Sequence, residues 1–305
     1  MGYEELGMSF EDYQKEPGLN FSTAKEALSC PIKYLDRKEN QTTETTPAME
    51  LGTLTHAALL EPGRWRNGIY KAPDGIRRGT KAWKEIELAA GSKKIVKAAD
   101  YDRAVAMAES VRSSEDAEFY LESQWYAPWL SEEKRDILKY DHTVDTIHSL
   151  NEVSIFWTDP RTGLKLKGRI DCLSCRDEEL LVVDLKTSAD ASPRAMENKL
   201  CSAPYHYLLQ MAWYCRGVKH VFEENNKCGV GNGACIIAVE NKKPYAVGTY
   251  LIDMDDIELA NRAIDNLLDE IVKIENGELD KGIHYKQNHI YAPDWWCKLQ
   301  QEAVK

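Results

Sequence analysis

The chain has 305 residues, of which 43% are hydrophobic and 29% charged, and its formal net charge is −11. Its 8 Trp and 15 Tyr residues exclude an intrinsically disordered chain, and no apolar run approaches the roughly 20 residues that a membrane span requires. The acidic balance argues against a general nucleic-acid coat protein, and the acidic start without an apolar segment argues against a secretory signal, so we expect a soluble cytoplasmic protein with no membrane partner.

Helical patterns dominate the first half of the chain. A polar, Thr-rich loop is expected over Glu39–Pro47, and Ser22 is a suitable cap for the first helix. The expected helices are Ser22–Tyr34, Met49–Glu61, Lys81–Ala90, Ala98–Ser113 and Ala117–Leu130.

The pattern changes to that of strands near residue 152. The segments Glu152–Thr158 and Leu180–Thr187 are rich in β-branched and apolar residues, and Leu164–Asp171 alternates between apolar and basic residues. Turn signals at Asp159–Gly163 and Arg176–Glu179 separate these segments. Three consecutive antiparallel strands are the simplest interpretation.

A helix, two strands and an acidic helix are expected in the remainder. They are a helix from Pro193 or Pro204 to about Arg216, strands Ala234–Glu240 and Ala246–Ile252, and a helix Asp255–Asn276 that we interpret as a solvated face. The order predicts a mixed α/β fold, with a central mixed β-sheet flanked by helices and a helical N-terminal elaboration. We expect a single domain over residues 1–305, with a mainly helical part (1–150), a sheet core with a motif helix (151–252) and a C-terminal helix and tail (253–305).

The 8 cysteines do not form a metal-binding pattern. Only Cys172 and Cys175 form a close pair, and no second pair completes a four-thiolate site. We therefore expect reduced cysteines that behave as small core residues, and no iron–sulfur cluster.

Three polar residues on neighbouring strands carry the chemistry. Because side chains alternate along a strand, Asp184 and Lys186 point to one face, and a hairpin would bring Asp171 close to Asp184. Two converging carboxylates suit Mg²⁺ or Mn²⁺, and a lysine beside them can orient a water or offset charge on a phosphoryl transition state. The alternative for Asp184 and Lys186 is an ion pair on a solvent-facing strand edge. The Asp on the preceding strand favours a metal site.

Four motifs in order resemble the PD-(D/E)XK nuclease superfamily, and its RecB-like branch in particular. They are Gly168-Arg-Ile-Asp171, Val182-Val-Asp-Leu-Lys-Thr187, Gln210-Met-Ala-Trp-Tyr214 and, upstream, Leu51-Gly-Thr-Leu-Thr-His56. The segments His56–Pro62, Arg77–Trp83 and Phe156–Asp159 resemble the nuclease domain of exonuclease VIII (RecE type) and its phage relatives. The likeness spans roughly Phe21 to Trp296 and implies a restriction-endonuclease-like core in a bacterial or phage-encoded protein. Asp184 stands where Glu is commoner, and the Pro of the motif name is absent.

The resemblance implies a role for each motif residue. Asp171 and Asp184 would bind Mg²⁺, with Mn²⁺ able to substitute, and the Leu185 carbonyl would be a third ligand. Lys186 would position or activate the attacking water. His56 would be a further ligand.

Two of the implied ligands have plain structural alternatives. His56 sits among apolar residues and could be a satisfied core histidine, which its spacing alone favours. Glu152 could supply another carboxylate, or it could be a solvated residue at the start of its strand.

The motif helix presents Gln210 and Tyr214 on one face, together with Tyr207. The family interpretation is a polar pair that touches the DNA strand or steadies Lys186. The alternative is aromatic packing into a core, which we accept for Trp213.

The basic loop before Trp83 is the best candidate for a phosphate clamp. Arg77, Arg78 and Lys81 offer donors, and Trp83 could stack on a terminal base. A solvated basic loop with Trp83 in the core is an equal alternative.

The resemblance as a whole implies a metal-dependent exonuclease that degrades one strand of duplex DNA from an end, 5′→3′, and leaves 3′ single-stranded tails for recombination. Expected partners are duplex DNA ends and a single-strand annealing protein, and the expected assembly is a ring-shaped homo-oligomer. The alternatives are a RecB-like nuclease of other polarity, an endonuclease and a non-catalytic DNA-end-binding protein.

Overall fold

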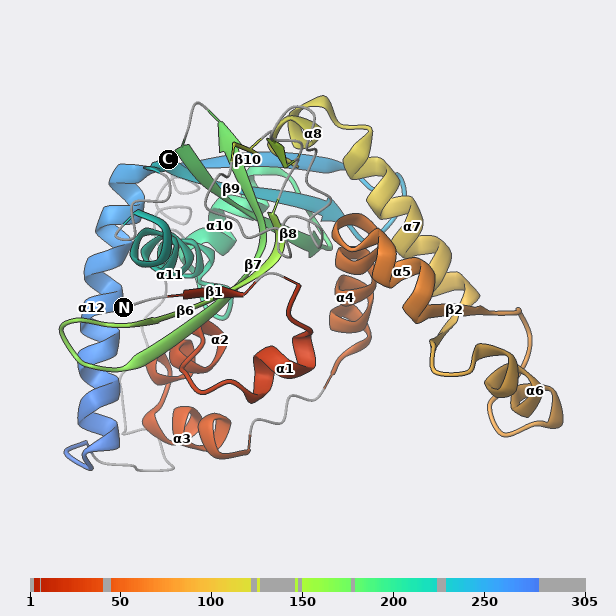
Figure 1. Ribbon diagram of the computed structural model, residues 1–305, viewed down its shortest axis with the longest axis horizontal. Helices are drawn as coiled ribbons and strands as arrows, with labels where there is room; N and C mark the ends of the chain where they lie inside the picture. Colours follow the sequence, from red (N-terminus) through yellow and green to blue (C-terminus); the bar gives the residue numbers. More distant parts are fainter. Residues whose placement is uncertain are drawn as a thin grey trace, which may run out of the picture.

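The computed structural model describes residues 3–5, 7–40, 45–121, 125–126, 146–147, 150–176, 179–223 and 229–279. Their centre is a six-stranded mixed sheet in the order β1-β6-β7-β8-β9-β10. Its strands are β1 (Tyr3–Glu5), β6 (Leu150–Thr158), β7 (Lys165–Arg176), β8 (Glu179–Ser188), β9 (Gly229–Glu240) and β10 (Val247–Asp253). This arrangement, with helices on both sides (Figure 1), confirms the predicted mixed α/β class.

The three central strands are antiparallel neighbours, as predicted. The turn between β6 and β7 is fixed by Asp159, whose Oδ1 accepts hydrogen bonds from the N–H and hydroxyl of Thr162, both at 2.8 Å. Gly163 closes the turn at φ 74°, a conformation that L side chains rarely adopt. Beyond β8, strand β9 adds in parallel and β10 returns antiparallel.

One face of the sheet is covered by α10 (Pro193–Cys201), α11 (Tyr207–Val218) and α12 (Met254–Glu275). Trp213 is buried in this layer, which confirms its predicted core position. Gly217 lets α11 approach β6, because a Cβ there would lie 2.5 Å from Ile155 Cδ1. The acidic helix α12 is therefore more than a solvated face, since its apolar side, including Ile264 and Leu268, is fully buried.

The opposite face is covered by α4 (Pro47–Leu60), α7 (Ala98–Arg112) and α8 (Glu115–Leu121). Burial on both faces explains the continuous apolar run of β8, because Val182 packs on the α11 side while Val183 and Leu185 pack on the α4 side. Cys172 and Cys235 are buried in the α4 layer, as expected for core cysteines. The expectation is wrong for Cys201, which is exposed, and Cys30 is only partly buried.

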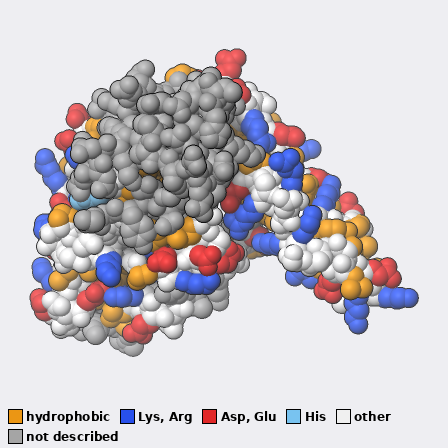
Figure 2. Space-filling model, viewed as in Figure 1, with side chains coloured by type: hydrophobic (Ala, Val, Ile, Leu, Met, Phe, Trp, Pro, Cys, Tyr) orange, Lys and Arg blue, Asp and Glu red, His pale blue; other side chains and the backbone are white. Residues whose placement is uncertain are grey.

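An arm extends from the body beyond α5 (Pro62–Gly68). It consists of a parallel strand pair, β2 (Ile69–Ala72) and β3 (Lys94–Lys97), and of α6 (Lys81–Ala90), whose bounds match the predicted helix. On the face seen in Figure 2, Lys and Arg side chains gather where this arm joins the body.

The N-terminal helical region is more broken than predicted. The expected helix Ser22–Tyr34 is replaced by α2 (Phe21–Ala24), the 3₁₀-helix η1 (Lys25–Leu28) and α3 (Pro31–Asn40), preceded by α1 (Phe10–Lys15). Pro31 has no N–H and starts a new helix, and the cap of α2 is Asn20, whose Oδ1 accepts from Thr23 N at 2.9 Å, rather than Ser22.

Other boundaries differ by more than a residue or two. The helix expected up to Arg216 is two helices, α10 and α11, and continues into the π-helix η2 (Lys219–Glu223). Of the helix expected over Ala117–Leu130, residues Trp125–Tyr126 form β4, paired with β5 (Thr146–Ile147), and 122–124 and 127–130 lie outside the described residues. Among the described helices, none has both the length and the apolar character needed to cross a bilayer.

Candidate active site

The sheet forks between β7 and β8. Backbone pairing of these two strands ends at Cys172–Val183, whereas β7 stays paired with β6 as far as Lys165 and β8 stays paired with β9 as far as Ser188. Asp171 and Asp184 are the first residues beyond the last pair, one on each side of the opening. The predicted approach of these two residues thus rests on a strand register, and the fork opens the space in front of them.

The backbone of Leu185 supplies the groups that hold the fork in place. Its N–H, which has lost a β7 partner, donates to Asp171 Oδ2 at 2.8 Å. Its carbonyl oxygen lies 2.9 Å from His56 Nε2. A carbonyl can only accept, so His56 Nε2 carries the proton of this hydrogen bond. The Leu185 carbonyl, predicted as a metal ligand, is here the acceptor that orients His56.

That hydrogen bond fixes how His56 faces the acids. The other ring nitrogen, Nδ1, lies 3.6 Å from Asp171 Oδ1 and 4.0 Å from Glu152 Oε1. In the neutral tautomer this nitrogen presents a lone pair to the acids, which a metal ion between them can accept. Metal-binding histidines use the same arrangement, in which the second ring nitrogen donates to a backbone carbonyl.

Glu152 reaches the cluster through an unusual backbone conformation. Asn151 pairs with Cys172 and Val153 with Ile170, so Glu152 lies opposite Asp171. Its φ is +54°, a strained value for a non-glycine residue that is often associated with functional sites. Glu152 is the third residue of β6, and its side chain is 15% exposed. The alternative, a solvated residue at the start of the strand, is therefore wrong.

Arg169 is a site residue that the sequence interpretation missed. Its Nε donates to Glu152 Oε2 at 2.6 Å, and its Nη1 donates to Ser154 Oγ and to the Met8 carbonyl. The sequence feature that could have identified Arg169 is its position two residues before Asp171 on the same strand, which places both side chains on one face. Arg169 holds one oxygen of Glu152 and leaves the other toward His56.

Asp184 and Lys186 form a buried ion pair, as their shared strand face predicts. Lys186 Nζ lies 2.6 Å from Asp184 Oδ2, with the two side chains 17% and 2% exposed. Among the described residues, no hydrogen-bond donor is well aligned with this buried oxygen. Lys186 Nζ also lies 5.0 Å from the centre of the Tyr207 ring. The alternative of a solvent-facing pair is therefore wrong.

The charges of the site shift two titrations in ways that bear on its chemistry. Burial, together with the charges of Asp184 and Glu152, raises the pKa of Asp171 to about 7 against the lowering effect of His56 and Lys186. Burial lowers the pKa of Lys186, but Asp184 and Asp171 outweigh it and raise that pKa above its ordinary value. Lys186 is therefore a cation at neutral pH and not a free base.

Gln210 and Tyr214 lie on α11 against the other side of the fork. Gln210 Nε2 donates to Tyr214 Oη at 3.0 Å, and the ring of Tyr214 packs on Gly168, where a Cβ would lie 3.2 Å from Tyr214 Cδ1. Burial and the nearby Asp184 and Asp171 raise the pKa of Tyr214 well above its usual value. The contacts described for Lys186 are with Asp184 and Tyr207, so a direct steadying of Lys186 by Gln210 is not among them.

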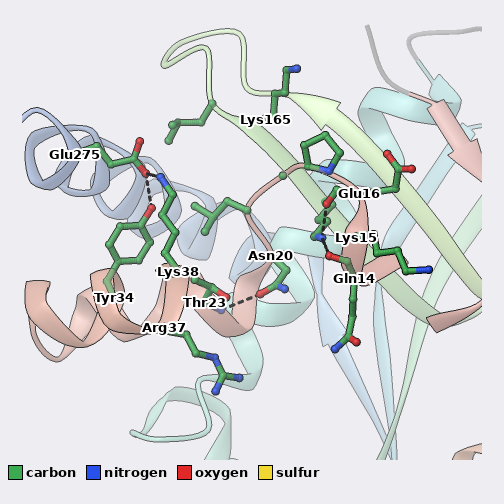
Figure 3. A pocket seen from close by; sticks show the side chains of 15 residues that line it. Gln14, Lys15, Glu16, Asn20, Thr23, Tyr34, Arg37, Lys38, Lys165 and Glu275 are labelled. Carbon is green, nitrogen blue, oxygen red and sulfur yellow. Dashed lines mark hydrogen bonds and ion pairs between the residues drawn. The ribbon is translucent and has the colours of Figure 1, made fainter. Parts of the chain in front are cut away.

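The site opens into a cavity of about 490 Å³ lined by residues of α1, α4, β7 and α11, including His56, Asp171 and Tyr214. An adjoining cavity of about 480 Å³ shares Lys167 and Arg37 with it. In this second cavity, seen in Figure 3, Tyr34 and Lys38 both reach Glu275. The two cavities therefore lie next to each other along α1 and β7.

The basic loop and Trp83 lie away from this opening, on the arm. Arg77, Arg78 and Lys81 are exposed and line no part of the active-site cavity as described. Trp83 is half-buried, its Nε1 donates to Glu87 Oε1 at 2.7 Å, and Arg78 lies 5.5 Å from its ring centre. Trp83 thus packs within the arm and is not part of either core layer.

The donor set fits a divalent cation. Ligand atoms of His56, Glu152 and Asp171 lie within 4.8 Å of one another. Carboxylates with one imidazole suit Mg²⁺, and Mn²⁺ accepts the imidazole more readily. Asp184, also predicted as a ligand, is paired with Lys186 and is not one of these three residues.

Comparison with known proteins agrees with the geometry. A family model described as a PDDEXK-like domain of unknown function (DUF3799) matches residues 20–282. The search of curated proteins gave no match. A crystal structure from Eubacterium rectale, described as that of a presumed exonuclease, aligns over 94% of this chain and 97% of its own with a TM-score of 0.58 and 12% identity, and so shares the fold.

Two further solved structures align poorly. The protein SSO0001 aligns over 90% of this chain and 93% of its own, with 13% identity and a TM-score of 0.27. Protein VC1899 from Vibrio cholerae aligns over 91% of this chain and 57% of its own, with 9% identity and a TM-score of 0.25. Neither carries an argument about this site.

Proposed function

Because the chain belongs to the family of PDDEXK-like domains, we propose that it is a metal-dependent nuclease that hydrolyses phosphodiester bonds of DNA at the fork between β7 and β8. Family membership and the shared fold support a nuclease in general. The single observation that carries the proposal is the convergence of Asp171, Glu152 and Nδ1 of His56 beside the buried pair Asp184–Lys186.

Each residue has a role that follows from its contacts. Asp171, Glu152 and His56 would hold Mg²⁺ or Mn²⁺, with Asp184 as the further carboxylate that the family pattern provides. A cation held there supplies Lewis-acid stabilisation of a phosphoryl oxygen and lowers the pKa of a bound water. Lys186, charged and desolvated, offers a fixed ammonium that positions the water and stabilises charge developing on the phosphate. Asp184 fixes that ammonium.

The finer proposal concerns the substrate. We propose an exonuclease that acts on one strand from a duplex end, 5′→3′, and leaves 3′ tails for recombination. Its support is the resemblance of the motifs to the exonuclease VIII type and the description given to the Eubacterium rectale structure. Gln210 and Tyr214 would contact the strand in the cavity. The loop with Arg77, Arg78, Lys81 and Trp83 would contact duplex phosphates.

Assembly and partners are part of the same proposal. The resemblance supports a single-strand annealing protein as partner and a ring-shaped homo-oligomer that encloses DNA. A non-catalytic end-binding protein is the candidate of a different class. The desolvated Lys186 beside two acids argues against it, since burying an ammonium costs free energy that binding alone does not require.

Digestion of end-labelled linear duplex and covalently closed circles of the same sequence tests the proposal. We expect Mg²⁺-dependent shortening of the linear DNA, survival of the circles and no reaction in EDTA. Linear duplexes labelled at the 5′ or the 3′ end separate the two polarities. Rapid nicking of closed circles would replace the exonuclease with an endonuclease, and binding of ends without any cleavage would favour the non-catalytic alternative.

A further inference from the structure

A third cavity, a groove of about 840 Å³, lies on the other side of α4 from the active site. Met49, Gly52 and His56 of α4 line the active-site cavity, whereas Glu50, Leu51 and Leu54 line this groove. The start of α7, strand β3, the arm loop and the β9–β10 turn complete its walls. The groove and the active-site cavity are therefore separated by α4 alone where both are lined by it.

The groove concentrates positive charge in a chain whose net charge is −11. Five basic residues from four separate segments line it, and none has an ion-pair partner among the described residues. They are Arg78 on the arm loop, Lys97 and Arg103 at β3 and α7, and Lys242 and Lys243 in the β9–β10 turn. Of the two acids that line it, Glu50 is paired with Lys94 at 3.1 Å, which leaves Asp100.

The cations of the active-site cavity are used differently. Arg169 is bound to Glu152, Arg64 to Glu61 at 2.9 Å, and Lys167 Nζ donates to three backbone carbonyls that include that of Glu16. These three side chains therefore bind acids or carbonyls of the protein itself. The five basic side chains of the groove are exposed to solvent. Unpaired cations that different segments bring together attract a polyanion.

We propose that this groove binds the phosphate backbone of duplex DNA that flanks the strand under cleavage. The inference rests on the proposed nuclease function and adds a second surface to it, which joins the arm loop to the body. A duplex fits better than a single strand, because single-strand sites stack bases on aromatic rings. Tyr245 is the aromatic residue among the groove-lining residues described.

The test is equilibrium binding of a labelled blunt duplex and of the matching single strand in EDTA, over a range of salt concentrations. The variant is Arg103→Ala with Lys242→Ala, two exposed residues from different elements. The matched control is Arg262→Ala with Lys273→Ala, which removes the same charge from the exposed side of α12. Thermal midpoints confirm that both variants are folded.

We expect the groove variant to lose affinity for duplex and to flatten the slope of log K against log salt by about 2, near 0.9 for each lost phosphate contact. The control and the binding of single strand should match wild type. An unchanged duplex slope, or an equal change in the control, would overturn the proposal. An equal loss for single strand and duplex would also overturn it.

Failure of this inference differs from failure of the nuclease proposal. If wild-type protein cleaves DNA and the groove variant binds duplex with the wild-type slope, the groove alone is wrong. If wild-type protein neither binds nor cleaves DNA, both proposals are wrong.

Discussion

The raised pKa of Asp171 affects the stability of the protein with a definite sign. This pKa is about 7 in the folded protein and near its ordinary value of 3.8 when the chain unfolds. The folded state thus binds this proton more tightly, and metal-free stability falls as pH rises from about 4 to about 7. We expect Asp171→Asn to raise the metal-free free energy of unfolding relative to wild type at pH 8, by up to roughly 4 kcal/mol, and to change it little at pH 4. A difference between the two proteins that does not vary with pH would contradict this.

Lys186 is expected to serve the transition state rather than the binding of metal. Lys186→Ala should lower kcat by about 10²–10³-fold, as does the loss of one preorganised electrostatic donor elsewhere. Affinity for Mn²⁺, measured by calorimetry, should stay within a few-fold of wild type. Lys186→Arg, which keeps the charge, is the control. Wild-type cleavage by Lys186→Ala would remove this lysine from the mechanism.

The variant His56→Ala distinguishes a metal-binding role of His56 from a purely structural one. If its Nδ1 binds the metal, His56→Ala should raise the Mn²⁺ concentration for half-maximal cleavage by about tenfold or more. The metal-free free energy of unfolding should fall by no more than about 1 kcal/mol, which is the contribution of the lost hydrogen bond to Leu185. A drop of several kcal/mol with unchanged metal dependence would show that His56 supports the fold alone.

At the scale of the element, α11 and β7 meet through a glycine. Gly168→Ala would place a Cβ 3.2 Å from Tyr214 Cδ1 and 3.4 Å from Ile155 Cγ1, so the Tyr214 ring must move. We expect a loss of about 1–3 kcal/mol in the free energy of unfolding, together with reduced activity. In a Tyr214→Ala background, the same substitution should cost less, because the tighter contact is gone. Equal costs in both backgrounds would show that Tyr214 does not restrict this position.

The strands of the sheet were predictable from the sequence, whereas the fork between β7 and β8 was not. Alternation and β-branched runs placed β6, β7 and β8 with errors of a few residues, and the Asp184–Lys186 pair followed from the period of two. Where pairing stops is a tertiary property, so no local pattern marks Cys172–Val183 as the last pair. The predicted helix Ser22–Tyr34 is interrupted at Pro31, because proline has no N–H to continue a helix and starts a new one instead.

Some site residues could likewise be predicted from the sequence, whereas the contacts that they make could not. The motif pattern indicated His56, Asp171 and Lys186, but the role of the Leu185 backbone depends on the fork and had no sequence signal. The positive φ of Glu152 falls on a residue type that does not favour it, so only the structure shows it. Arg169 was visible in the motif, and its bond to Glu152 required the register of β6 against β7.

At the scale of the whole molecule, charge is sorted by position. Acids gather at the fork and along α12, while unpaired cations gather in the groove beside α4. An average charge of −11 therefore hides a basic surface next to an acidic centre, and a bound cation would reduce the repulsion between that centre and a phosphate. Metal-dependent hydrolysis at the fork is the claim that joins these features.

Cleavage of end-labelled linear duplex by wild-type protein and by Asp184→Asn, over a Mn²⁺ titration with an EDTA arm, tests that claim most directly. Asp184 is buried, and Asn keeps its size while removing the charge that fixes Lys186. Wild type should cleave with a saturable dependence on Mn²⁺ and not at all in EDTA, and Asp184→Asn should be inactive at every concentration while it remains folded. Cleavage by wild type in EDTA, or by Asp184→Asn at the wild-type rate, would contradict a metal-dependent nuclease centre at this fork.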